Sequence, residues 1–367
     1  MKEETVLPEM SPAKLLARRH RRFLSAPAKR HGLLPAAWFH HSLRRERARS
    51  DRTGREFALL VFMPRERTTA KKTNLRVAEE LRRRLARDDE AGWFDEERIA
   101  VILTEVPAER AWQLADEVCL TFPLEAAPPL CEVFVYPSQS APDWDGPDLL
   151  AHDVTDERPA RRLEDVFVQP LPWWKRLIDL LGAWFGLVLF APLMALLALL
   201  IKLETPGPVF FRQWRTGHGG RPFVMYKLRS MAADAERQRA ALAAYNEQDG
   251  PAFKIQSDPR VTRLGRWLRS TSLDELPQLW NVLRGEMSLV GPRPLPCDES
   301  DACALWQRRR LDVPPGLTCI WQVRGRSRVS FEEWMQMDLQ YVDTHSIGQD
   351  VRLLLATVWA VLRRTGA

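Results

Sequence analysis

Short apolar runs and amphipathic stretches alternate in the first part of the chain. Residues 57–63, 99–103 and 132–136 are rich in apolar side chains and predict buried strands. Between them, residues 74–87 and 108–119 carry apolar side chains at helical spacing and predict amphipathic helices. Strands that alternate with helices in this way predict a small ferredoxin-like α/β sandwich.

The longest apolar run lies in the middle of the chain. Residues 180–201 contain no charged side chain over 22 positions. As a straight helix such a run would be about 33 Å long, enough to cross the hydrocarbon core of a bilayer. A buried helix of a soluble protein is the alternative, but such helices rarely lack polar positions over so many turns. We therefore predict a membrane helix over residues 177–202.

One proline and the flanking charges indicate how that helix meets the membrane. Pro192 lies near its middle and predicts a kink, because proline has no backbone N–H. Basic residues stand on both sides: Arg158, Arg161, Arg162, Lys175 and Arg176 before the run, and Lys202, Arg212, Arg215 and Arg221 after it. Because neither flank dominates, we favour a re-entrant helix that bends at Pro192 and returns to the same face over a single span. The side chains that suit an interfacial belt are Trp173, Trp174 and Trp184.

Charge is concentrated at the start of the chain. The first 55 residues carry 14 basic and 5 acidic side chains, whereas the whole chain has a net charge of +6. Residues 1–42 predict a basic helical leader, with breaks around Pro27 and Pro35. Such a leader suits an anionic membrane face or nucleic acid, and a solvated tail is an equal alternative. It lacks the apolar core of a signal peptide, so we expect it to stay in the cytosol.

Composition narrows the class of protein. A chain of 367 residues suggests about two domains, and residues 138–172, rich in Pro, Asp and Arg, predict the linker. A content of 45% hydrophobic and 28% charged residues excludes a disordered or fibrous chain. The five cysteines are odd in number and form no Cys-x-x-Cys pair, which argues against a disulfide framework or a zinc ribbon. Reduced thiols are expected.

The candidate chemistry lies after the apolar run, in DPRVTRLGRWLRSTSLDELPQLWNVLRGEMSLVGPRP. Asp274 and Glu275 are adjacent carboxylates among apolar residues, with arginines on both sides. Buried carboxylates raise each other's pKa unless a cation lies nearby. Such a site suits a divalent metal together with a phosphate. The alternative is the N-terminus of a helix, with Ser272 as its N-cap.

Three further segments are informative. The turn SLVGPRP holds Arg293 between two prolines, and a guanidinium group recognises phosphate oxygens. The segment PGLTCIWQVRGR predicts a turn, a short strand and a glycine turn, in which Gln322 and Arg326 could bind a base or a phosphate. A surface loop and an ordinary hairpin are the alternatives. Residues 347–364 predict an amphipathic helix that lies on the membrane or packs on the core.

From Lys175 onwards the chain resembles the bacterial sugar transferase family, the monotopic phosphoglycosyl transferases. The resemblance rests on KRLIDLLGAW, on TPGPVFFRQWRTGHGGRPFVMYKLRSM and on the segments quoted above. It implies that residues 173–367 transfer a phospho-sugar from a UDP-sugar to undecaprenyl phosphate at the cytoplasmic face of the bacterial inner membrane. A re-entrant helix broken at Pro192 is implied with it. We expect the reaction to release UMP through a phospho-sugar bound covalently to Asp274.

The resemblance also implies roles for single residues. It places the catalytic pair, and the ligands of a magnesium ion, on Asp274 and Glu275. The phosphate-handling arginines fall on Arg269 and Arg293. The further candidates for binding phosphate or substrate are Lys227, Arg229, Asp258, Arg260, Gln322 and Arg326. The departures from the family pattern are Ala191, Cys319 and Arg324, where Ser, Gly and a small residue or Asn are usual.

Residues 43–137 resemble a degenerate nucleotidyl-cyclase domain of the GGDEF type. The resemblance rests on LRRERARSDRTGREFALLVF and GWFDEERIAVIL. The signature turn would fall on residues 95–99, where both glycines are replaced, and Phe62, Met63 and Pro64 stand where the family has a metal-binding aspartate. Cyclase activity is therefore not expected. A regulatory or docking module, able to form a homodimer, and a structural spacer are equal interpretations.

A second class of function is a membrane-tethered signalling or nucleic-acid-binding protein. The intact segments DELPQLWNVL and SLVGPRP argue against it, because an inactive descendant would be expected to lose Asp274 or Arg293. We therefore expect three partners, a UDP-sugar, undecaprenyl phosphate and membrane lipid, and no nucleic acid. The expected fold class is α+β: a re-entrant membrane helix with a compact, mostly helical catalytic domain, preceded by the ferredoxin-like domain.

Overall fold

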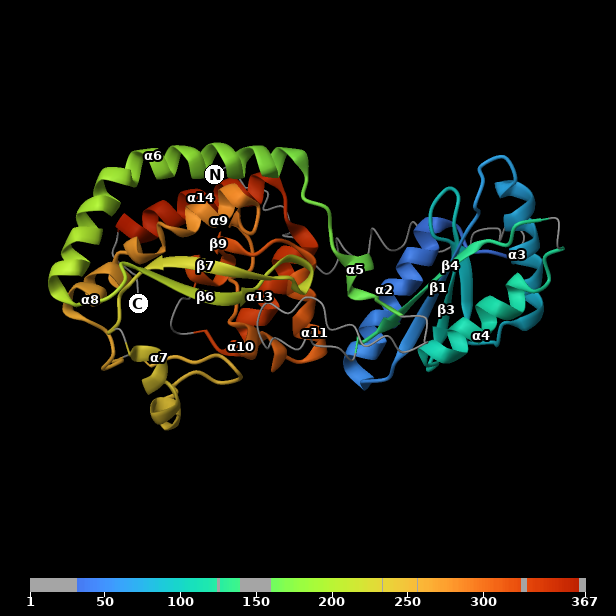
Figure 1. The fold of residues 1–367 in the computed structure, drawn as a ribbon, viewed down its shortest axis with the longest axis horizontal. Helices are drawn as coiled ribbons and strands as arrows, with labels where there is room; N and C mark the ends of the chain where they lie inside the picture. Colours follow the sequence, from blue (N-terminus) through green and yellow to red (C-terminus); the bar gives the residue numbers. More distant parts are fainter. Residues whose placement is uncertain are drawn as a thin grey trace, which may run out of the picture. The chain divides into compact units, whose positions relative to one another are not determined.

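The computed structural model describes residues 32–123, 126–138, 160–232, 234–255, 257–324 and 329–362. The chain divides into two compact units, one built mainly on residues 55–135 and the other on residues 162–367 (Figure 1). Most of the predicted leader and residues 139–159 of the predicted linker lie outside the described residues.

The first unit is built on a five-stranded sheet with the strand order β2-β3-β1-β4-β5. Its strands are β1 (Phe57–Met63), β2 (Glu90–Trp93), β3 (Ile99–Thr104), β4 (Leu130–Tyr136) and β5 (Arg161–Arg162). β1 and β3 are antiparallel, with Phe57 opposite Thr104 and Phe62 opposite Ile99. The three strands predicted from apolar runs are confirmed. The short β2 and β5 were not predicted, because four and two residues are too few to show a pattern.

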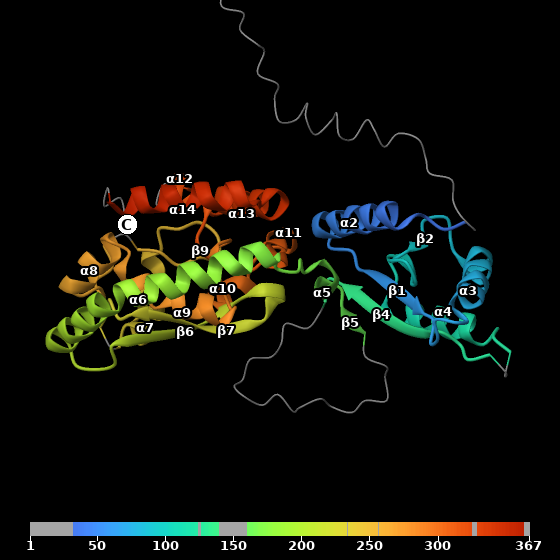
Figure 2. The same ribbon diagram turned by 90° about the horizontal axis from the view of Figure 1, so that it is seen from above.

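Helices cover both faces of this sheet: α2 (Ala36–Thr53), α3 (Ala70–Arg84) and α4 (Ala108–Cys119). Leu60 and Phe62 of β1 share a buried cluster with Leu81 of α3 and Leu114 of α4. Figures 1 and 2 show α2 on the opposite face of the sheet. Because both faces are covered, β1 is a continuous apolar run rather than an alternating one.

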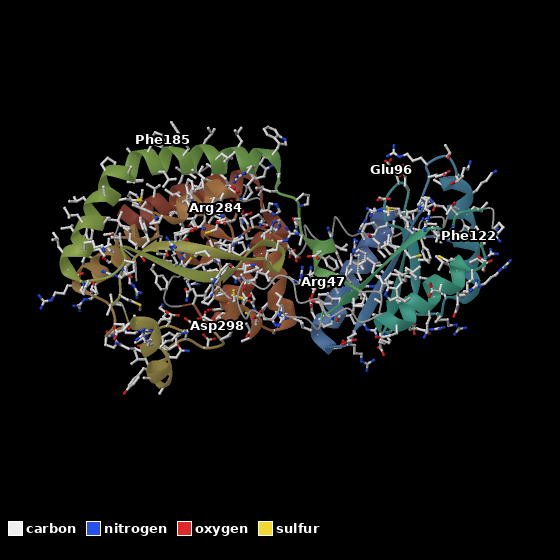
Figure 3. The ribbon with its side chains drawn as sticks, in the orientation of Figure 1. Arg47, Glu96, Phe122, Phe185, Arg284 and Asp298 are labelled. Carbon is white, nitrogen blue, oxygen red and sulfur yellow. The ribbon has the colours of Figure 1, made fainter. Side chains whose placement is uncertain are left out.

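The second unit begins with α6 (Trp173–Glu204), which contains the predicted membrane helix and continues past both of its ends. Among the described residues, α6 is the one helix long and apolar enough to cross a membrane. It bends along its length and keeps the rest of the unit on its inner side (Figure 1). On its outer side the ring of Phe185 is 61% exposed and points away from the unit (Figure 3).

The inner side of α6 packs closely on the unit. A Cβ atom at Gly182 would lie 2.6 Å from a methyl group of Leu289, so glycine permits this approach. Lys175 was counted among the basic residues that flank the membrane helix. It is buried, and its Nζ donates to Asp350 Oδ2 at 2.6 Å and to the Tyr341 hydroxyl at 3.0 Å.

Two small sheets and several helices complete the second unit. An antiparallel hairpin joins β6 (Phe210–Thr216) to β7 (Pro222–Leu228), and β8 (Ser288–Val290) runs parallel to β9 (Gly316–Thr318). The longer helices are α8 (Arg263–Ser270), α9 (Gln278–Arg284), α13 (Phe331–Thr344) and α14 (Ile347–Leu362). The shorter ones are α5 (Glu164–Phe167), η1 (His218–Gly220), α7 (Ala235–Gln238), η2 (Ala240–Tyr245), η3 (Leu273–Glu275), α10 (Cys297–Asp301), α11 (Leu305–Arg308), η4 (Arg309–Asp312) and α12 (Ile320–Arg324).

One predicted segment of this unit needs correction. The strand expected within PGLTCIWQVRGR is present as β9, but it is short and helix α12 follows it. Ile320 of α12 is buried in the main core of the unit, and this tertiary contact outweighs the local strand pattern. The expected glycine turn, at Gly325, lies outside the described residues. Arg326 lies outside the described residues.

Candidate active site

The acidic pair lies in a single 3-10 turn, η3, between α8 and α9. Ser272, just before it, has left-handed backbone angles, φ 57° and ψ 19°, and its side chain makes no capping hydrogen bond. Ser272 thus occupies the N-cap position of η3, as the alternative interpretation expected, but its side chain does not cap the turn. A left-handed residue other than glycine costs about 1–2 kcal/mol, so the surrounding contacts must hold this turn in place.

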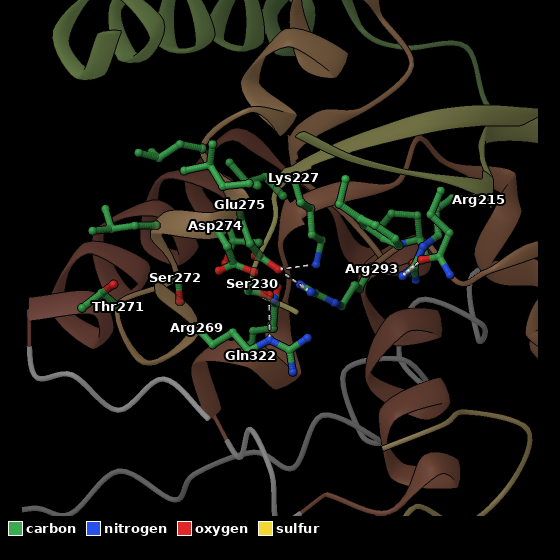
Figure 4. Close-up of a pocket in the computed structure, with 18 of the residues that line it drawn as sticks. Arg215, Lys227, Ser230, Arg269, Thr271, Ser272, Asp274, Glu275, Arg293 and Gln322 are labelled. Atoms are coloured by element: carbon green, nitrogen blue, oxygen red, sulfur yellow. Dashed lines mark hydrogen bonds and ion pairs between the residues drawn. The ribbon is translucent and has the colours of Figure 1, made fainter. Parts of the chain in front are cut away.

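Glu275 is held by two cations. Its Oε1 accepts from Lys227 Nζ at 3.0 Å, and its Oε2 accepts from Arg293 Nη1 at 3.3 Å (Figure 4). Lys227 comes from β7, and Arg293 from the loop after β8. Burial alone would raise the pKa of Glu275, but Arg293 and Lys227 hold it well below its usual range. The carboxylate of Glu275 is therefore ionised at any physiological pH.

Asp274 differs from its neighbour. It is 6% exposed, and among the described residues no side-chain hydrogen bond reaches its carboxylate. Burial raises the pKa of Asp274 to about 6, with the ionised Glu275 adding to the rise and Lys227, Arg269 and Arg293 opposing it. The pair is thus split into a permanent anion bound to cations and a carboxylate that titrates near pH 6.

A third cation, Arg269, reaches the pair from α8. Its Nε donates to Ser230 Oγ at 3.0 Å (Figure 4). The approach of α8 depends on Gly265, because a Cβ atom there would lie 1.9 Å from the Ser230 carbonyl oxygen. Burial lowers the pKa of Arg269 and Asp274 opposes this shift. Arg269 thus adds positive charge that acts on Asp274, with its orientation set by Ser230.

These side chains line one cavity of about 1670 Å³ in the second unit. Of the predicted site residues, it brings together Asp274, Glu275, Lys227, Arg229, Arg260, Arg269, Arg293 and Gln322. Asp258 does not line the cavity. It binds Arg260 through both carboxylate oxygens, at 2.9 and 2.7 Å, and so supports that arginine. Arg229 has both terminal nitrogens bound to Thr205 and Pro206, at the end of α6.

The cavity also contains a residue that the sequence did not suggest. Arg215 was expected on the flank of the membrane helix, but it lies in β6 and lines the cavity (Figure 4). Its Nη1 donates to the Pro294 carbonyl oxygen at 2.9 Å. Burial lowers the pKa of Arg215 to about 10, and Arg293 adds to this shift. No alternation of apolar and polar residues along β6 marks Arg215 as facing inward, so the sequence carries no signal that could have placed it.

The acidic pair was predicted to hold magnesium. Among the described residues, no three His, Cys, Asp or Glu side chains converge on one point. Magnesium usually takes one or two protein carboxylates, and substrate phosphates complete its shell. Asp274 fits that pattern as a hard oxygen ligand. Glu275 fits it less well, because its two oxygens already accept from Lys227 and Arg293.

Residues 171–364 match the bacterial sugar transferase family. The chain belongs to this family. It is 43% identical over 194 residues to a galactosyl transferase, CpsE, of Streptococcus agalactiae. The aligned residues cover 53% of this chain and 43% of CpsE. It is 44% identical to a UDP-glucose:undecaprenyl-phosphate glucose-1-phosphate transferase of Caulobacter vibrioides over 53% and 71% of the two chains. ExoY, an exopolysaccharide production protein of Rhizobium meliloti, is 40% identical to this chain, and the alignment covers 53% of this chain and 87% of ExoY.

The family match leaves the first unit unassigned, and the chain spans less than half the length of CpsE. A GGDEF domain of DgcB from Caulobacter crescentus is similar at 16% identity and a TM-score of 0.27, over 30% of this chain and 78% of that one. A TM-score of this size does not establish a shared fold. The resemblance of residues 43–137 to a degenerate GGDEF domain therefore stays a prediction.

Proposed function

We propose that this protein transfers a sugar phosphate from a UDP-sugar to undecaprenyl phosphate, as a first membrane step in making a polysaccharide or glycoconjugate. The observation that carries the proposal is a buried Asp274 beside a Glu275 whose charge is balanced by Lys227 and Arg293. Relatives 38–44% identical to this chain are named as transferases that act on undecaprenyl phosphate.

In the first step, an oxygen of Asp274 attacks the phosphorus that carries the sugar. The bond between that phosphorus and the bridging oxygen breaks, and UMP leaves with the bridging oxygen. A carboxylate that attacks an anionic diphosphate needs nearby positive charge. Arg269, Lys227 and Arg293 supply that charge, because each favours the ionised form of Asp274. The product is a mixed anhydride of Asp274 and the sugar phosphate.

In the second step, an oxygen of undecaprenyl phosphate attacks the same phosphorus. The bond to Asp274 breaks, the carboxylate is restored and the lipid diphosphate-sugar forms. Each step replaces one phosphorus–oxygen bond with another, so neither needs an oxidant or a net proton. Glu275 keeps Lys227 and Arg293 beside the reacting group through its two ion pairs.

Asp274, with Glu275 nearby, would hold a magnesium ion in this site. When bound with substrate phosphates, magnesium would neutralise part of the diphosphate charge. Asp274 supplies the carboxylate ligand, and Glu275 contributes by fixing the cations that share the cavity. This division of roles follows from the ion pairs of Glu275, which leave Asp274 as the carboxylate with available oxygens.

The acceptor is a lipid, so the site has to lie near the membrane surface. The exposed apolar side chains of α6 and α14 support a protein that sits in one leaflet, on the cytoplasmic face of the bacterial inner membrane. In this proposal α6 is re-entrant, with its bend at Pro192. The first unit is proposed as a docking module, with homodimer formation as one use of it.

A UMP-release assay with a panel of UDP-sugars and undecaprenyl phosphate tests this function. Asp274→Asn should abolish UMP release, because an amide cannot replace the nucleophile. Glu275→Gln should lower turnover by about a hundredfold, since it removes the partner of two cations. Thermal unfolding of the same variants checks that both are folded. Wild-type activity in a folded Asp274→Asn protein would rule out this mechanism.

A further inference from the structure

The backbone around Arg293 is held by three cationic side chains from three different elements. Lys175 of α6 donates to the Val290 carbonyl oxygen at 2.9 Å, and Arg215 of β6 donates to that of Pro294 at 2.9 Å. Arg310, in η4, donates from Nη2 to the carbonyl oxygen of Arg293 itself. The loop that presents Arg293 is therefore fixed from outside as well as by its own prolines.

Arg310 is itself held in one orientation. Its Nε and Nη2 bind Asp338 Oδ2 of α13 at 2.9 and 2.8 Å. The side chains of Arg310 and Asp338 are 3% and 1% exposed. A planar guanidinium group can bind a carboxylate and still direct a further N–H at a carbonyl oxygen. Lysine has no such fixed geometry, so the fork of Arg310 is what joins α13 to the Arg293 backbone.

The local chemistry of the loop explains why this contact matters. Pro292 and Pro294 fix their own φ angles, so the main freedom left lies in the backbone of Arg293. The direction of the Arg293 carbonyl sets its ψ angle, and Arg310 holds that carbonyl. On the other side, the Arg293 guanidinium meets Glu275. A rotation at this one residue would therefore move the guanidinium away from the acidic pair.

We propose that Arg310, held by Asp338, is a positioning residue that keeps Arg293 in place against Glu275. The expected effect on turnover rests on the proposed function, whereas the expected effect on the position of Arg293 against Glu275 does not. If this buried ion pair only stabilised the fold, weakening it would lower thermal stability and leave the turnover of the folded protein unchanged.

The test uses Arg310→Lys in the full chain, with Arg176→Lys as the matched control. Arg176 also donates to two backbone carbonyls, those of Val282 and Leu283, each at 2.7 Å, and it does not reach the loop. Small misplacements of catalytic groups lower rates by about tenfold to a hundredfold. We expect such a loss of kcat for UMP release in Arg310→Lys, with KM changed less than about twofold. Arg176→Lys should lose thermal stability with kcat unchanged.

Three results would overturn the proposal. The first is a folded Arg310→Lys protein with wild-type kcat. The second is an equal fall of kcat in Arg176→Lys. The third is a crystal structure of Arg310→Lys in which Arg293 still binds Glu275, and this result is informative even if the wild-type chain releases no UMP. If Arg310→Lys does not fold, Asp338→Asn replaces it, and the expected loss is in the same direction.

Discussion

At the scale of single residues, the site depends on the different surroundings of two adjacent carboxylates, Asp274 and Glu275. Glu275 binds two cations and stays ionised, whereas Asp274 is buried without a comparable partner among the described residues. This difference assigns them different tasks under the proposed function. Glu275 organises positive charge, and Asp274 is the nucleophile, with burial removing the water that would shield it.

The pH dependence of turnover follows from this difference. Burial raises the pKa of Asp274 to about 6, and only the ionised form can attack phosphorus. We therefore expect kcat/KM for UMP release to fall as the pH drops through 6, by about tenfold for each unit below it. kcat/KM is the proper quantity, because it reports groups of the free enzyme.

Glu275→Gln is the control for this prediction. The substitution removes the anion that adds to the raised pKa of Asp274 and leaves Lys227 and Arg293 to face that carboxylate. The acid limb should then move to lower pH in whatever activity remains. A limb at the same pH in both proteins would show that a different group titrates.

Single residues also show what the sequence could and could not predict. Asp274, Glu275, Lys227 and Arg293 stand in recognisable motifs, and the structure places them around one cavity. The links from Arg269 to Ser230 and from Arg310 to the Arg293 backbone join distant segments. Such contacts leave no trace in local periodicity. The left-handed backbone of Ser272 is likewise invisible, because serine seldom adopts it.

At the scale of elements, α6 is fixed to the catalytic unit at its start. Lys175 is buried and binds Asp350 of α14, Tyr341 of α13 and the Val290 carbonyl oxygen. Replacing one partner leaves the other charge buried and unpaired, which costs about 3–5 kcal/mol. We expect Asp350→Leu to lower the free energy of unfolding by that amount, measured by chemical unfolding in detergent.

The double variant Lys175→Met with Asp350→Leu is the matched comparison. Because no lone charge remains, the loss should be much smaller than in Asp350→Leu alone. Losses that simply add would contradict a direct pairing of the two side chains. The same comparison separates the ion pair from the apolar packing of α6, which both variants retain.

Elements also differ in how well their patterns predicted them. α4 and β1 lie at their predicted bounds, because α4 shows a clear helical periodicity and β1 is a continuous apolar run. The hairpin of β6 and β7 was not predicted, since its strands carry charged side chains at inward and outward positions alike. Helix α12 lies where the strand was expected to continue, because Ile320 is buried in the core.

At the scale of the whole molecule, an apolar helix and a charged cavity belong to the same unit. α6 carries exposed apolar side chains over most of its length, and the acidic pair lies in the unit that it packs against. A water-soluble donor and a lipid acceptor can meet only where such surfaces adjoin. The first unit has its own sheet and core, and none of its described residues lines this cavity.

The most direct measurement is intact-protein and peptide mass spectrometry after brief mixing with a UDP-sugar in the absence of undecaprenyl phosphate. The account predicts an added mass of one sugar phosphate on the peptide that contains Asp274, which disappears when the lipid acceptor is supplied and never forms in Asp274→Asn. Product formation with no adduct at any time, in a protein that needs both substrates bound together, would contradict it.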